Sequence, residues 1–484
     1  MQADFFRKHF IKGFVALHVT AWTLIPTLTY RNAPMDVMEG FVWGREWQLG
    51  TYKHPPLQSW LLEIAGTLFG TSGIGYFGLS ALCGGIALWA VYRTALLLSD
   101  ETTAIFSTAL TQTILYFTFL SPEFNPNTLQ LLLWALAGYA FSRALVLEST
   151  RSWLALGLIF AAGFYAKYSM AVCALSFGMF LLIEPKYRKW YLRPQPYAGA
   201  LLCVLLLIPN ALWLHEFGYL PFHYAASRFV HVTGMAQSAL AAVNFTAAQI
   251  GVLAPSIVLA ALLVVSKGRK FPQASLIRWL AFAPLLIVVV PSFISKRGLP
   301  SMWGTPMLTF IPLWLVTSYR INAAKVRTFT IAWLVVFLLT LGAFAGNELF
   351  AASLGFKPSR GQYPGRAVGE YYFQAWKKNS GSSFIYVAGT EWEAANIAFY
   401  SPERPRPHVW IYGTDSFSPW IKEDDVLNQG AVLVWNADET KHPGWVDVFM
   451  SRFPGATLQE EHTFSKGVVL GSLILPPAAE RKLQ

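Results

Sequence analysis

The sequence predicts an all-α polytopic membrane protein of about eleven transmembrane helices, followed by a small C-terminal α/β domain. Of its 484 residues, 54% are hydrophobic and only 13% are charged, whereas soluble domains carry about 25% charged residues. Aromatic residues make up 15% of the chain, and aromatic rings gather where a bilayer meets water. This composition excludes an ordinary soluble enzyme.

Apolar runs of the length that a bilayer requires, roughly 20 residues, recur throughout residues 1–346. The first run is preceded by basic residues but is not followed by a good cleavage site, so we expect an uncleaved helix. The predicted spans lie near 11–30, 73–98, 103–121, 127–147, two short helices within 153–183 broken around Tyr165–Tyr168, 197–215, 241–266, 276–294, 303–319 and 328–346.

The net charge of +11 would suggest a nucleic-acid partner in a soluble protein, but here the basic residues lie in short connections between spans. Because Lys and Arg prefer cytoplasmic loops, these connections orient the chain with its N-terminus in the cytoplasm. No nucleic-acid partner is expected. The basic connections, all on one face, are Arg7–Lys12, Arg93, Arg143–Arg151, Lys186–Arg193, Lys267–Lys270 and Arg320–Arg327.

The tail at 347–484 has a different character, because charged residues return. Short β-rich runs at 383–388, 408–412 and 431–435 alternate with helical patterns at 391–400 and 444–453. Such alternation is typical of a sheet covered by helices. We therefore expect a transmembrane domain at 1–346, with an outer loop at 31–72, and a periplasmic α/β domain at 347–484.

The outer loop carries the residues most typical of a chemical site. Asp36 and Glu39 are three positions apart, so a helix beginning there would place both carboxylates on one face, where they could orient and activate a nucleophile. Alternatively, Asp36 caps the N-terminus of an interfacial helix. The spacing alone leaves both interpretations open.

Three segments resemble the glycosyltransferases of the protein O-mannosyltransferase superfamily (glycosyltransferase family 39), especially the bacterial branch that includes the aminoarabinose transferase acting on lipid A. Asp36 follows the first helix and precedes the run Tyr52-Lys53-His54-Pro55-Pro56-Leu57. A short polar loop at 121–128 precedes a span, and Lys167-Tyr168 lies at the helix break. The turn at 295–300 contains Lys296 and Arg297 and precedes Trp303.

The resemblance implies a GT-C fold and an inverting transfer from a polyprenyl-phosphate sugar donor, without a cofactor. Asp36 matches the family's general base, which removes the proton of the acceptor hydroxyl. Glu39 lies in the same acidic segment, although many members place the second acid directly beside the first, where this chain has Val37. In the second outer loop many relatives have Asp, whereas this chain has Glu123 and Asn125. Glu123 is either a substitute acid or a solvated charge at a helix end.

A lipid-phosphate leaving group calls for cations at the outer membrane surface. The candidates are Lys53, Lys167, Lys296 and Arg297. Lys167 is the most informative of them, since an ionisable side chain in an apolar helix pair is costly and usually serves a site, although a lysine at a helix end also snorkels. The predicted substrate-binding residues are Tyr52, His54, Glu123, Asn125 and Tyr168.

No metal site is assigned, although a divalent ion between His54 and Glu39 is conceivable. A lone His beside two prolines more often holds a loop through hydrogen bonds. The expected partners are the lipid donor, the bilayer and an envelope lipid or glycan acceptor, such as lipid A or lipopolysaccharide core, at a bacterial inner membrane. A protein acceptor stays open, as does a transporter or flippase, although a transporter should show paired halves and none is evident.

Overall fold

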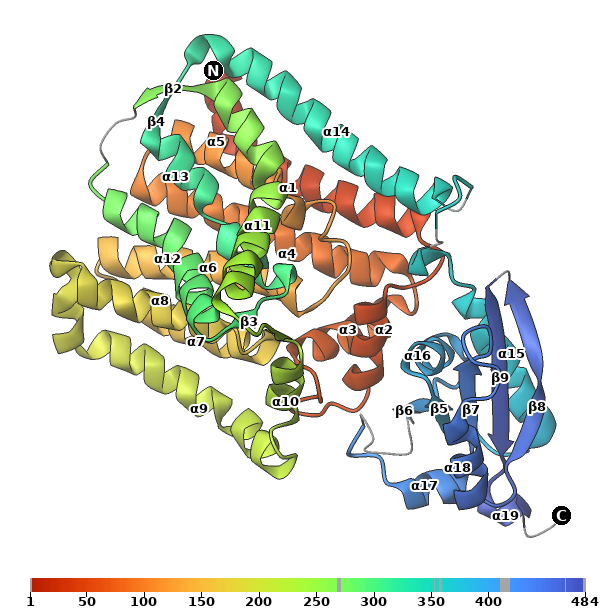
Figure 1. Cartoon of the computed structure of the whole chain (residues 1–484). Coiled ribbons are helices and arrows are strands. Elements are labelled where there is room, and N and C mark those ends of the chain that lie inside the picture. Colours follow the sequence, from red (N-terminus) through yellow and green to blue (C-terminus); the bar gives the residue numbers. More distant parts are fainter. Residues whose placement is uncertain are drawn as a thin grey trace. The chain divides into compact units, whose positions relative to one another are not determined.

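The apolar runs of residues 1–346 fold into helices, as the sequence predicts. The structure, a computed structural model, describes residues 2–267, 271–351, 353–356, 359–409, 418–465 and 467–481. The helices of this part are α1 (Gln2–Thr29), α4 (Gly73–Leu98), α5 (Glu101–Gln112), α6 (Pro126–Val146), α7 (Thr150–Ala166), α8 (Met170–Ile183), α9 (Pro194–Glu216), α10 (Leu220–Ser227), α11 (Met235–Leu263), α12 (Ala274–Ile294), α13 (Ile311–Ser318) and α14 (Val326–Phe350) (Figure 1).

Seven helices of the described chain are long and apolar enough to cross a membrane by themselves, and an eighth candidate is α8 joined to the segment Pro185–Leu192 through a 108° bend. The protein is therefore a multi-pass membrane protein. The seven are α1, α4, α6, α9, α11, α12 and α14.

Of the remaining predicted spans, the two short helices on either side of the break near 165–168 are confirmed as α7 and α8, whereas the spans predicted at 103–121 and 303–319 are divided into shorter pieces. The span predicted at 103–121 ends at Gln112, where the hydroxyl of Thr113 donates to the carbonyl of Leu110 at 2.8 Å, a local bond that competes with continuation of the helix. The span predicted at 303–319 is divided into a 3-10 segment (Ser301–Leu308) and α13. Pro306 and Pro312 lie in these pieces, and proline cannot donate the hydrogen bond that a continuous helix needs.

The chain divides into two compact units. One, called here the helical unit, comprises Met1–Thr27, Lys53–Gln58 and Tyr76–Asn347. The other, called the mixed unit, comprises Leu28–Tyr52, Ser59–Gly75 and Glu348–Gln484. Most of the predicted outer loop thus belongs to the same unit as the C-terminal tail.

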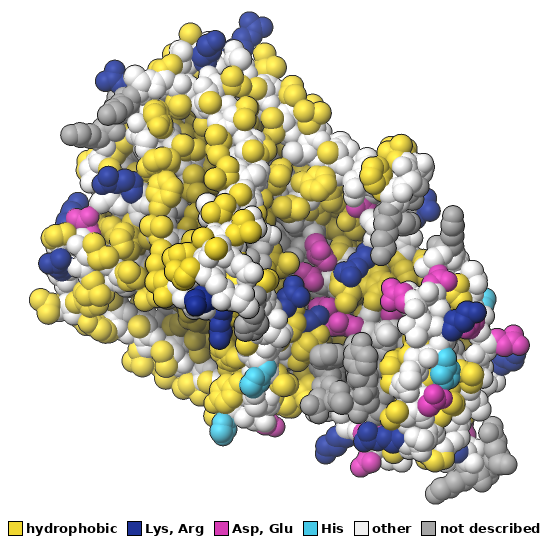
Figure 2. All heavy atoms as spheres, in the orientation of Figure 1, with side chains coloured by type: hydrophobic (Ala, Val, Ile, Leu, Met, Phe, Trp, Pro, Cys, Tyr) yellow, Lys and Arg dark blue, Asp and Glu magenta, His cyan; other side chains and the backbone are white. Residues whose placement is uncertain are grey.

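Outward-facing apolar side chains mark the surface of the helical unit. Leu212 is 65% exposed and Leu339 is 64% exposed, and Figure 2 shows hydrophobic side chains over much of the visible face of this unit. Such exposure would be unfavourable in water but suits contact with lipid chains. Two short antiparallel ribbons join its connections: β1 (Val230–His231) pairs with β3 (Arg297–Gly298), and β2 (Val264–Lys267) pairs with β4 (Tyr319–Ile321).

The mixed unit contains a five-stranded sheet with the order β6-β5-β7-β9-β8. Strands β5 (Tyr386–Gly389), β6 (Arg406–Val409) and β7 (Ala431–Asn436) are parallel, and β8 (Thr457–Ser465) and β9 (Val468–Leu475) add an antiparallel hairpin. The predicted strands are confirmed where they are described, and residues 410–412 lie outside the described residues. The hairpin was not predicted.

Helices cover both faces of this sheet, which confirms the expected small α/β domain. Alternate residues of β7 point to opposite sides, so Val432 and Val434 pack with α15 (Gly365–Asn379) and α16 (Glu391–Tyr400). Leu433 and Trp435 pack with α17 (Glu423–Gln429) and α18 (Gly444–Arg452). The unit also contains α2 (Met35–Gly44), α3 (Leu57–Phe69) and a C-terminal turn, α19 (Ala478–Arg481).

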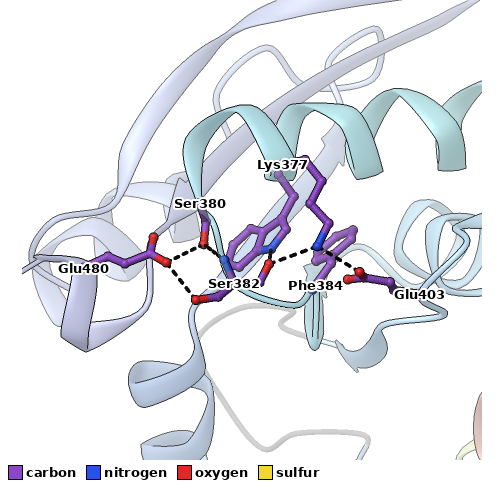
Figure 3. A network of polar contacts seen from close by, with 7 residues as sticks. Lys377, Ser380, Ser382, Phe384, Glu403 and Glu480 are labelled. Atoms are coloured by element: carbon purple, nitrogen blue, oxygen red, sulfur yellow. Dashed lines mark hydrogen bonds and ion pairs between the residues drawn. The ribbon is translucent and has the colours of Figure 1, made fainter.

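A polar network fastens α19 to the turn that follows α15 (Figure 3). The carboxylate of Glu480 accepts hydrogen bonds from the hydroxyls of Ser380 at 3.1 Å and Ser382 at 2.7 Å. Lys377 forms an ion pair with Glu403 at 2.8 Å and donates to the carbonyl of Ser382 at 3.2 Å. These contacts stabilise the turn around Gly381.

Close packing of α7 on α9 gives a test of the helical unit. A methyl group on Gly157 would lie 2.2 Å from the carbonyl oxygen of Gly199, so Gly157→Ala must separate the two backbones, at a cost of about 1–3 kcal/mol. We expect a lower melting temperature for this variant. The control Gly251→Ala, in open space on α11, should melt at or above the parent's temperature because Ala favours helix. Equal melting of the two variants would contradict the packing.

Candidate active site

Lys167 lies at the break between α7 and α8, where the sequence predicts a lipid-phosphate contact. Its backbone is extended (φ −165°, ψ 135°), which ends α7. The Nζ atom donates to Oδ1 of Asn127 at 2.6 Å and lies 6.0 Å from the centre of the Trp303 ring. The ammonium group therefore lies between the amide oxygen of Asn127 and an aromatic face.

Gln130, buried in α6, satisfies the backbone at this break. Its Nε2 donates to the carbonyl oxygens of Gly163 at 2.8 Å and Lys167 at 3.3 Å. Its Oε1 accepts from Nε1 of Trp134 at 2.6 Å. An interrupted helix within a bilayer needs such partners for its freed backbone groups, so the amide of Gln130 stabilises the conformation that presents Lys167.

Lys53 and His54 both contact a residue that the sequence analysis missed, Tyr224 of α10. The Nζ atom of Lys53 lies 5.8 Å from the centre of the Tyr224 ring, and the His54 ring meets the same tyrosine edge to face at 5.9 Å. Burial, followed by the charges of Lys167 and Lys53, holds the pKa of His54 well below its ordinary value. His54 is thus neutral beside two cations.

Tyr168, the next residue at the break, is fixed by two contacts. Its hydroxyl donates to Oδ1 of Asn210 at 3.1 Å, and its ring stacks on Phe222 at 4.9 Å. Asn210 is 3% exposed, so it provides a buried anchor on α9. Tyr168 therefore joins α9 and α10 to the same break that presents Lys167.

Asn125, in the second outer loop, has a structural role. Its Oδ1 accepts from the backbone N–H groups of Asn127 at 2.9 Å and Thr128 at 3.1 Å, which caps the N-terminus of α6. The carbonyl of Glu123 accepts from the Thr128 hydroxyl at 3.1 Å. The cap positions Asn127, the partner of Lys167, so Asn125 acts on the cation indirectly. Substrate contacts of Glu123 and Asn125 stay predictions.

Lys296 and Arg297 lie on a different connection, the β1–β3 ribbon. Lys296 adopts a left-handed backbone conformation with φ 55°, and both side chains are exposed. The guanidinium carbon of Arg297 lies 5.4 Å from the centre of the Phe229 ring. Of the four predicted cations, Lys53 and Lys167 thus share one neighbourhood with His54, and the contacts of Arg297 are with the ribbon.

In the mixed unit, Asp36 and Glu39 lie on α2 as predicted. The N-cap position of α2 is Pro34, and Asp36 follows within the first turn, so Asp36 is not the cap residue. A carboxylate in a first turn is favoured by the helix dipole. Glu39 is only 6% exposed, which removes most of its carboxylate from water.

Two arginine forks connect α3 and the residues that follow α2 to the region of β6. Arg406 donates through Nε and Nη2 to the two oxygens of Glu46 at 2.7 and 2.6 Å. Arg404 donates through Nη1 and Nη2 to the two oxygens of Glu63 at 3.3 and 2.8 Å. Each carboxylate side chain is only 12% exposed. Bidentate pairs of this kind are strong and directional, so they restrict the orientation of both helices.

Hydrogen bonds hold the remainder of the outer loop in the mixed unit. The hydroxyl of Tyr52 donates to Oε1 of Glu391 at 3.0 Å. The backbone N–H of Ala33 donates to the Tyr400 hydroxyl at 3.0 Å, and the carbonyl of Gly361 accepts from the N–H of Asn32 at 3.0 Å. Tyr52 therefore has a positioning contact in addition to its predicted substrate role. No group of three His, Cys, Asp or Glu residues in the described segments could hold a metal ion.

Comparison with known proteins tests the resemblance that the sequence shows. Residues 53–213 match the family model described as dolichyl-phosphate-mannose-protein mannosyltransferase. No curated protein matches the chain. The structure is similar to ArnT from Cupriavidus metallidurans bound to undecaprenyl phosphate, with a TM-score of 0.65 and 11% identity over 96% of this chain and 98% of that one. For the apo state of ArnT the TM-score is 0.62, with 11% identity over 95% of this chain and 98% of that one.

At this level of identity the structural likeness shows the fold, and the family model adds the sequence signature. Both agree with the resemblance seen in the sequence, which is thus confirmed. Residues 53–213 therefore carry the sequence signature of that family, and the chain has a GT-C fold similar to that of ArnT.

The lowered pKa of His54 predicts a pH dependence of stability. The folded protein keeps His54 neutral, whereas the unfolded chain gains a proton near pH 6.5. Below that pH the unfolded state binds more protons, so the free energy of unfolding falls as the pH falls. We expect the melting temperature to drop less between pH 7.5 and 5.5 in His54→Gln than in the parent.

The matched control is His215→Gln, which removes a solvent-exposed imidazole of α9. It should show the same drop as the parent. If His54→Gln behaves like the control, the burial of a neutral His54 is refuted.

Proposed function

We propose that the protein transfers a sugar, with inversion, from a polyprenyl-phosphate donor to an envelope lipid or glycan at the outer face of a bacterial inner membrane. The cluster of Lys53, His54 and Lys167 carries this proposal, because two cations gather at a break in an apolar helix bundle. The donor head is the anion that this cluster would receive. Undecaprenyl phosphate, bound by the similar ArnT, is a carrier of this chemical class.

The reaction assigned to the site is a single displacement. The acceptor hydroxyl oxygen attacks the anomeric carbon while the bond between that carbon and the phosphate oxygen breaks, and the bonding electron pair leaves with the polyprenyl phosphate. Asp36 takes the proton of the hydroxyl and later returns it to water. Lys167 and Lys53 stabilise the negative charge that develops on the leaving phosphate.

The remaining site residues have supporting roles in this proposal. Lys296 or Arg297 provides a further phosphate contact, and Glu39 supports Asp36 on the same helix. Glu123, Tyr52 and Tyr168 contact the substrates. Lipid A or lipopolysaccharide core is the acceptor that the resemblance to the bacterial branch favours, and a glycosylated protein is the alternative outcome of a product analysis.

Lys167→Met tests the phosphate contact. Methionine keeps the length of the side chain but removes its charge, and a charge-assisted hydrogen bond contributes about 1.5–3 kcal/mol. We expect the purified variant to bind polyprenyl phosphate at least about tenfold more weakly than the parent, with its melting temperature nearly unchanged. Lys325→Met, which removes an exposed lysine before α14, should bind like the parent. Parental binding by Lys167→Met would show the assignment to be wrong.

Asp36→Asn tests the general base. General-base assistance contributes typically 10²- to 10⁴-fold, so transfer from a defined lipid-linked donor should slow by about that factor. The amide keeps the shape of the side chain, so expression and melting should stay near the parent's. The control Asp438→Asn changes an exposed carboxylate of the mixed unit and should remain active. A near-parental rate in Asp36→Asn would end the catalytic assignment.

The placement of the chain in the membrane is also proposed. Residues 31–52 and the tail after 347 belong to one compact unit, so they must lie on the same side, and the charge pattern assigns that side to the periplasm. The N-terminus and the basic connections would then be cytoplasmic.

Cysteine labelling from the periplasm tests this orientation. The native thiols, Cys83, Cys173 and Cys203, are all buried, so they give little background. A methylene group at Gly381 meets no atom within 4 Å, and Gly381→Cys should react with a membrane-impermeant maleimide in spheroplasts, whereas Lys189→Cys should react only after lysis. The reverse pattern would overturn the topology.

A further inference from the structure

A second binding site is suggested by a groove of about 430 Å³ between α8 and α12. The two helices lie against one another, and Nε1 of Trp279 on α12 donates to the carbonyl of Ser176 on α8 at 2.8 Å. On α8 the lining of the groove begins at Met179. At a rise of 1.5 Å per residue, Met179 lies about 13 Å along the helix from its first residue, Met170. The groove is therefore separate from the helix break that carries Lys167.

One part of the groove is apolar and faces outward. Its walls include Met179, Ile183, Phe282, Leu286 and Ile287. Ile183 is 53% exposed and Leu286 is 60% exposed. These side chains form an apolar trench along about 13 Å of α12, from Arg278 to Ile287.

The other end of the groove carries opposite charges. Glu184 follows α8, and Ser275 and Arg278 lie in the first turns of α12. Across the described residues, neither the Glu184 carboxylate nor the Arg278 guanidinium forms an ion pair or a side-chain hydrogen bond. The two charges line one groove without pairing with each other. The start of α12 adds a positive helix-dipole end beside Arg278.

We propose that this groove binds one zwitterionic phospholipid with an ammonium headgroup. Arg278 and Ser275 bind its phosphate, Glu184 binds its ammonium group, and one acyl chain occupies the apolar trench. Phosphatidylglycerol carries the same phosphate but a neutral glycerol in place of the ammonium group, so it would leave the Glu184 carboxylate without a cationic partner. The groove therefore distinguishes phosphatidylethanolamine from phosphatidylglycerol, and the bound lipid would brace the contact between α8 and α12.

Native mass spectrometry of the full-length protein in detergent tests the site, with dioleoyl phosphatidylethanolamine and dioleoyl phosphatidylglycerol as probes. We expect one tightly bound phosphatidylethanolamine and about tenfold weaker binding of phosphatidylglycerol. Arg278→Ala should weaken the binding of both lipids about tenfold, because the lipid phosphate loses its arginine partner. Glu184→Gln should leave phosphatidylglycerol bound at least as well and abolish the preference between the lipids.

Arg327→Ala is the matched control, since it removes an exposed arginine from the first turn of another helix, α14. It should bind both lipids as the parent does. Equal binding by Arg278→Ala and Arg327→Ala, or a parent that takes both lipids equally, would mean that only non-specific surrounding lipid occupies the groove, and would overturn the proposal. Melting temperatures of the same samples separate lost binding from misfolding, and none of these outcomes depends on glycosyl transfer.

Discussion

The structure of the proposed donor site depends on one constraint: a bilayer offers no hydrogen-bond partners to an interrupted helix. At the break between α7 and α8, the buried side-chain amide of Gln130 supplies the missing partners. It donates to the carbonyl oxygens of Gly163 and Lys167 at 2.8 and 3.3 Å. Because the backbone is satisfied there, Lys167 can leave the helical path and point its ammonium group at Asn127. The cap formed by Asn125 then fixes Asn127 itself.

The C-terminal tail has a corresponding role in the mixed unit. Glu46 and Glu63 belong to the connection and helix that follow the acidic segment, and each receives a bidentate arginine from residues 404–406. Because these two ion pairs lie on neighbouring elements, they restrict both the rotation and the translation of those elements against the sheet. The tight contact of Gly44 with Ser59, whose carbonyl oxygen would lie 2.2 Å from an added methyl group, joins α2 to α3. The tail thereby stabilises the helix that carries Asp36.

Much of this architecture could be predicted, because apolar periodicity and charge alternation are local signals. The break at 165–168 was predictable because a lysine interrupts an apolar run. The long-range contacts could not be predicted. Tyr224 of α10 contacts Lys53 and His54, which are about 170 residues away in the sequence, and Arg406 pairs with Glu46 across 360 positions. Such pairs leave no trace in local spacing. The helix end at Gln112 and the division before Ile311 depend on single threonine and proline residues inside apolar runs. The apolar composition of those runs predicts a continuous span and hides these interruptions.

The central claim is that the sugar comes from a lipid phosphate, and its most direct test uses purified protein, a polyprenyl-phosphate sugar labelled in the sugar, and an extract of envelope lipids and glycans. The account predicts that label moves from the donor to an acceptor in the extract, that one polyprenyl phosphate appears for each sugar transferred, and that the new linkage has the inverted anomeric configuration. Transfer that requires a nucleotide sugar, or no transfer from the lipid donor, would contradict it.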